Sequence, residues 1–148
     1  MTNRLFVFAC VILMGSAAAS AQSAPAGRVK TATGAAHVVH AGSESAVQPG
    51  HIVYQGDLIR TGPDGRIGLT LNDDTRLSLG PDSELRLDRF SYAPADGQLA
   101  LAIKLIRGVA AYVSGRIAKL APDAIRIETP TAILGVRGTT LAIRAGTV

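Results

Sequence analysis

The sequence predicts an all-β fold, a single antiparallel jelly-roll-like sandwich of about nine or ten short strands. Three pairs of leucines, each with a polar residue between its members, follow one another at intervals of eight residues: Leu69 and Leu71, Leu77 and Leu79, Leu85 and Leu87. Side chains two residues apart lie on one face of a β-strand, whereas a helix would scatter them. Turn-forming Asn, Asp, Gly and Pro residues separate the pairs at 72–74 and 80–83. Residues 66–88 are therefore expected to form three short strands, each with one buried face.

Further strands are expected on both sides of this leucine-rich segment. Before it, strands are predicted at 27–33, 35–40 and 57–60, with a polar loop at 42–50 and a turn at 61–65. After it, a loop is predicted at 92–97, strands at 99–105, 109–113, 125–127 and 141–143, and a turn at 114–116. In the segment 109–113 the alternation places Val109, Ala111 and Val113 on one face. Links this short favour antiparallel neighbours over a parallel β-solenoid.

The first residues have the form of a secretory signal peptide, predicted over 1–21. Arg4 precedes an apolar run from Leu5 to Met14, and Ala19-Ser20-Ala21 resembles a signal-peptidase site. Ten apolar residues rise only about 15 Å as a helix, against a hydrocarbon core of about 30 Å. We therefore expect a periplasmic protein with no membrane span after cleavage. Residues 22–28 are predicted to be a flexible tether, and 29–148 a single β-domain.

Composition argues against nucleic-acid binding and against disulfide bonds. Cleavage would remove the single cysteine, Cys10, and would change the net charge from +4 to +3, because Arg4 is lost and no acid is. The remaining basic residues are dispersed among acids, and no basic block or aromatic cluster suggests nucleic-acid binding. No disulfide is expected.

No catalytic, metal-binding or cofactor-binding motif is found. His37 and His40 are three residues apart, so on a regular strand they point to opposite faces, and His51 stands alone. No G-x-S-x-G sequence occurs, and Asp73-Asp74 falls in a turn where Asp is favoured for backbone reasons. We therefore predict a protein that is not an enzyme, with no metal and no cofactor.

Three motifs together resemble the FecR domain family: TLNDDTRLSLGPDSELRLD, LIRGVAAYV and ETPTAILGVRGTTLAI. The resemblance covers residues 56–144. It implies a periplasmic jelly-roll-like domain, and in the founding role a receiver of signals from an outer-membrane transducer that regulates a sigma factor. Because no cytoplasmic segment precedes the apolar run, we expect only the periplasmic module to carry over.

The third motif supplies the candidate contact residues: Gly135, Arg137, Gly138 and Thr139. Glycines permit positive φ or close approach of another strand, and a guanidinium between them could grip a partner's carboxylate bidentately. An internal salt bridge of Arg137 is the alternative. The final strand is expected to be an exposed edge that can accept a partner strand.

Two functional hypotheses follow. The first is a non-enzymatic interaction or sensory module in cell-envelope signalling, whose partner is an unknown envelope protein. The second is binding of cell-wall or capsular polysaccharide. Such sites usually stack sugars on exposed aromatic rings, and Tyr112 is the candidate surface contact because it alternates with Val109, Ala111 and Val113.

Overall fold

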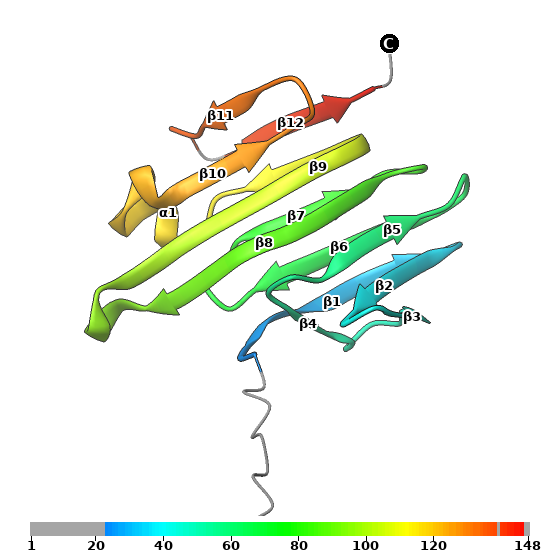
Figure 1. Ribbon diagram of the computed structural model, residues 1–148, viewed down its shortest axis with the longest axis horizontal. Helices are drawn as coiled ribbons and strands as arrows, with labels where there is room; N and C mark the ends of the chain where they lie inside the picture. Colours follow the sequence, from blue (N-terminus) through cyan, green and yellow to red (C-terminus); the bar gives the residue numbers. More distant parts are fainter. Residues whose placement is uncertain (1–22, 139, 147–148) are drawn as a thin grey trace, which may run out of the picture.

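The computed structural model describes residues 23–138 and 140–146 (Figure 1). The predicted signal peptide, 1–21, lies outside the described residues. Within them the chain forms β-strands, one short α-helix and two 3-10 turns: β1 (Pro25–Thr33), β2 (Ala36–His40), β3 (Ser43–Ala46), β4 (Ile52–Tyr54), β5 (Leu58–Thr61), β6 (Arg66–Leu71), β7 (Arg76–Leu79), β8 (Glu84–Ala93), η1 (Pro94–Asp96), β9 (Gln98–Val113), α1 (Arg116–Leu120), η2 (Pro122–Ala124), β10 (Ile125–Glu128), β11 (Ile133–Gly135) and β12 (Thr140–Ala145). The predicted all-β class is confirmed.

The strands form two layers that share the long strand β9. One layer has the order β4-β1-β6-β7-β9-β12, and the other has the order β3-β2-β5-β8-β9-β10-β11. The first half of β9 pairs with β8 and β10, whereas its second half pairs with β7 and β12. In Figure 1 the axes of the strands in both layers are nearly aligned. Among the described strands every pair is antiparallel except β9–β10, which is parallel and departs from the predicted arrangement.

The leucine pairs face the core from both layers. All six leucines are at most 2% exposed, as their alternation predicts. Leu69 lies directly opposite Leu77 on the antiparallel pair β6–β7, but β8, which carries Leu85 and Leu87, belongs to the other layer. The turn at 80–83 therefore carries the chain from one layer to the other, and the third leucine pair closes the core over the first two.

A β-bulge in β9 reverses its inward-facing side. Glu84 lies opposite Arg107 but Leu85 lies opposite Leu105, so β9 has one extra residue at this point. Gly108 follows with φ +88°, and a Cβ there would lie 2.2 Å from Ser83 Oγ. Because one inserted residue exchanges the two faces of a strand, Ala110 and Tyr112 are buried in place of the predicted Val109, Ala111 and Val113.

Two segments predicted to lack structure are strands. The predicted tether, 22–28, is wrong for residues 25–28, because β1 begins at Pro25, two residues before the predicted strand 27–33, and Ala26 is fully buried. A Cβ on Gly27 would lie 2.4 Å from Thr70 O, so the small residues here permit close contact between strands. The predicted polar loop, 42–50, contains β3, whose polar residues are all exposed because it forms a sheet edge.

The predicted turn at 114–116 leads into α1. This helix has five residues, too few to show helical periodicity in the sequence. Arg116 N donates to Asp73 O over 2.7 Å, which places the helix against the β6–β7 turn. No helix in the described part of the chain is long and apolar enough to span a membrane.

Candidate functional site

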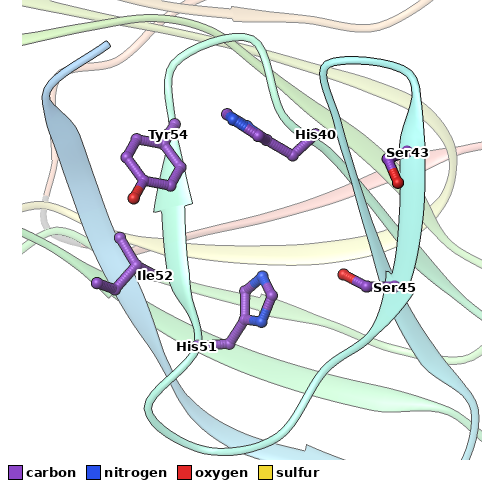
Figure 2. Close-up of a pocket in the computed structure, with 6 residues that line it drawn as sticks. All are labelled: His40, Ser43, Ser45, His51, Ile52 and Tyr54. Atoms are coloured by element: carbon purple, nitrogen blue, oxygen red, sulfur yellow. The ribbon is translucent and has the colours of Figure 1, made fainter. Parts of the chain in front are cut away.

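An open pocket of about 420 Å³ lies between β2, β3 and β4 (Figure 2). Its lining comes from a short stretch of sequence: His40, Ser43, Ser45, His51, Ile52 and Tyr54. We call it the β2–β4 pocket. β3 is the edge strand of one layer and β4 the edge strand of the other, so the pocket is lined from both layers. β11 forms the edge opposite β3 in the β3 layer.

A tight hairpin positions two of these residues. Ala41 and Gly42 both have positive φ, +48° and +80°, as a type I′ turn requires. The turn places His40 directly opposite Ser43 across the β2–β3 ladder. Ser45 lies two residues further on, so its side chain lies on the same face of β3 as that of Ser43. In Figure 2 the hydroxyl of Ser45 points toward the His51 ring.

A buried carboxylate holds His40 in place. Asp57 is 1% exposed, and its Oδ1 lies 2.5 Å from His40 Nδ1. Its other oxygen accepts a hydrogen bond of 2.8 Å from Tyr54 N. An ionised carboxylate only accepts hydrogen bonds, so the His40 Nδ1–H donates and Nε2 is left for other contacts.

The pocket combines an aromatic pair with unused polar groups. The rings of His40 and Tyr54 are 4.7 Å apart between centroids, at an interplanar angle of 41°. The side chains of Ser43, Ser45 and His51 hydrogen-bond to no described residue, and neither does the Tyr54 hydroxyl. The site therefore offers hydroxyl and imidazole groups beside an apolar surface. Nowhere in 23–138 and 140–146 are three or more His, Cys, Asp or Glu side chains grouped to hold a metal ion.

The contact residues predicted from the sequence lie elsewhere, at the β11 edge. Gly135 ends β11, and Arg137 and Gly138 follow in the loop to β12; all three are exposed. Thr139 lies outside the described residues. Arg137 makes no ion pair with any residue the structure describes, so the alternative of an internal salt bridge is not observed there.

The prediction that Gly135 and Gly138 permit positive φ or the close approach of another strand is wrong. Neither Gly135 nor Gly138 has positive φ, and a Cβ at either would meet no atom of the other described residues within 4 Å. Other side chains would fit both positions. Arg137 therefore lies in an open loop and not in a constrained bend.

The prediction of Tyr112 as a surface contact is also wrong. Its side chain is 0% exposed, because the bulge in β9 turns it into the core. Burial, together with the charge of Asp73, raises the pKa of Tyr112 to about 12. Its hydroxyl has no hydrogen-bond partner among the described residues. Tyr112 is thus a core residue.

The β11 edge has an exposed apolar side chain. β11 pairs with β10 alone among the described strands, so its outer edge has no ladder partner. Ile133 on this strand is 63% exposed. The final strand, β12, is an edge as the sequence predicts, because it pairs with β9 alone among the described strands. β11 is an edge of the other layer.

Sequence reasoning missed the β2–β4 pocket. The sequence marks the histidines only as candidate metal ligands, and the hairpin turn is Ala-Gly rather than the Asn-Gly that commonly marks a type I′ turn. Nothing in the sequence pairs Asp57 with His40, seventeen residues earlier.

Comparison with known proteins connects the β-domain to a family. A family model described as FecR protein matches residues 57–147, more than half of the 148-residue chain. No curated protein and no solved structure matches the chain. The β11 edge and Arg137 lie inside the matched region, whereas the six residues that line the β2–β4 pocket precede it.

Proposed function

Because the chain belongs to the FecR family, a regulatory family of the cell envelope, we propose that it is a non-enzymatic, periplasmic module that takes part in envelope signalling. In this proposal it acts by binding another envelope protein. The β11 edge, made of β11 and the loop that carries Arg137, is the contact surface.

The observation that carries this proposal is the combination of groups at the β11 edge. An unpaired strand edge can accept an extended segment of a partner through backbone hydrogen bonds. Beside it, Ile133 offers apolar surface, and Arg137 offers a guanidinium with no partner among the described residues. We therefore expect the partner segment to be extended, with an apolar side chain and a carboxylate.

Site-specific crosslinking in the protein's own cells tests this proposal. A photoreactive residue at Ile133 is expected to capture one discrete envelope protein, which mass spectrometry identifies. The same residue at Ser45, on the β3 edge, is the matched control and is expected to capture none of it. If position 133 captures no protein, or if both positions capture the same one, the β11 edge is not the contact surface.

Binding by Arg137 can be separated from stability once the partner is identified. Arg137→Lys keeps the charge but loses bidentate geometry, so affinity is expected to fall about tenfold, equivalent to about 1.4 kcal/mol. The midpoint of thermal unfolding should stay the same, since the side chain is exposed. A loss of stability that accounts for the loss of binding would contradict the role as an interface anchor.

A further inference from the structure

We propose that the β2–β4 pocket binds a neutral sugar ring of a cell-envelope glycan. This inference is independent of the proposed function, because the pocket lies between the edge strands β3 and β4, whereas β11 is the edge opposite β3 in the β3 layer. It also uses none of the residues that the sequence suggested for glycan binding.

The hydrogen-bonding groups of the pocket suit an uncharged, hydroxyl-rich ligand. Two serine hydroxyls, the His51 imidazole and the Tyr54 hydroxyl have no hydrogen-bond partner within the described residues. Among the residues that the structure describes, no Lys, Arg, Asp or Glu lines the pocket. The adjacent Asp57 is buried and engaged with His40 and Tyr54 N. A charged ligand would lose hydration here without meeting an opposite charge, whereas sugar hydroxyls both donate and accept hydrogen bonds.

The apolar part of the pocket matches the other side of a sugar ring. Tyr54 and His40 present adjoining aromatic rings, and Ile52 is 38% exposed beside them. The C–H face of a pyranose packs on such a surface while its hydroxyls reach the polar rim. The volume of about 420 Å³ lies within the range of small-molecule sites. Because the pocket is open, a ring inside a polymer can enter as well as a chain end.

The pocket is also preorganised for binding. The Asp57 carboxylate joins His40 to the backbone of Tyr54, which fixes the ring pair. Ala41 keeps a left-handed conformation that costs an alanine about 1–2 kcal/mol. A rigid site binds with less loss of conformational entropy than a flexible one.

Retention on purified polymers tests the proposal. The purified protein is mixed with peptidoglycan and, separately, with capsular polysaccharide from the same cells, and the retained fraction is measured at low and high salt. Retention on either polymer that persists at high salt supports a neutral sugar ligand, and the polymer that retains the protein identifies its source. Retention on neither, or retention that salt abolishes, overturns the proposal.

Pocket variants show whether the retention comes from this site. Ser45→Ala and His51→Ala each remove a free hydrogen-bonding group and are expected to weaken binding about tenfold. His37→Ala is the matched control, since His37 is on the same hairpin but lies 3.9 Å from Glu44 and does not line the pocket. Its binding should be unchanged. If all three variants bind alike while keeping the wild-type thermal midpoint, the glycan is held elsewhere and the proposal fails.

Discussion

The carboxylate of Asp73 accepts a buried hydrogen bond of 3.3 Å from the backbone amide of Ile117. The same carboxylate accepts hydrogen bonds from Thr75 N at 3.1 Å and Thr75 Oγ1 at 2.7 Å. Asp73, Thr75 and Ile117 are all fully buried. One side chain in the β6–β7 turn thus fixes the start of α1, and with it the route of the chain from β9 to β10.

Replacement of Asp73 is expected to destabilise the domain strongly. Asp73→Ala leaves three buried donors without an acceptor, so the free energy of unfolding should fall by about 3 kcal/mol or more. Urea unfolding followed by circular dichroism measures the change. Asp74→Asn is the control, because Asp74 is 66% exposed and Asn tolerates its φ of +69°. Equal losses in the two variants would show that burial of the Asp73 carboxylate has no special role.

Gly108→Ala should be among the most destabilising substitutions in β9. Its Cβ would lie 2.2 Å from Ser83 Oγ and 2.5 Å from Ser83 Cα, in addition to the strain of φ +88°. We expect a loss of more than about 3 kcal/mol. Gly97→Ala is matched in positive φ, +66°, but its Cβ would meet nothing within 4 Å, so only strain of about 1–2 kcal/mol applies. Thermal unfolding of both variants measures the difference.

Removal of the Tyr112 hydroxyl is expected to stabilise the protein. The hydroxyl is buried without a partner in the described part of the chain, and an unpaired buried polar group costs about 1–3 kcal/mol. Tyr112→Phe keeps the ring that fills the core, so the free energy of unfolding should rise by about 1 kcal/mol. Chemical denaturation at neutral pH tests this. A clear loss of stability would indicate that the hydroxyl is hydrogen-bonded in solution.

The same residue makes stability depend on alkaline pH. Burial, aided by Asp73, raises the pKa of Tyr112 from about 10 in the unfolded chain to about 12. A pKa raised by folding favours the protonated folded state, so this contribution is complete below pH 10 and is lost as the pH rises to 12. The loss is of the order of 2 kcal/mol. Unfolding measured from pH 8 to 12 should fall more steeply for the wild type than for Tyr112→Phe, and parallel curves would contradict the assignment.

The sequence predicted the core strands because their pattern is local. The leucines of β6, β7 and β8 alternate within single strands, and all six are buried as expected. The direction of Tyr112 could not be predicted in the same way. It depends on a one-residue bulge opposite Glu84 and Leu85, which are distant in sequence, and that single extra residue exchanges the two faces of the strand.

The candidate sites were predicted less well than the core. Arg137 is exposed as an interface residue must be, but its flanking glycines have no structural role in the described region. The β2–β4 pocket depends on two contacts that no local pattern specifies, between Asp57 and His40 and between the rings of His40 and Tyr54. Short edge strands such as β3 carry exposed polar residues and so have no apolar alternation to detect.

Strand β9 pairs with strands of both layers, and this affects how the domain unfolds. If the first half of β9 separates from β8 and β10, the second half, which pairs with β7 and β12, loses the support of the rest of the strand. Because β9 pairs with β8 and β10 in one layer and with β7 and β12 in the other, we expect the amide protons of these strands to exchange with solvent through one shared opening event.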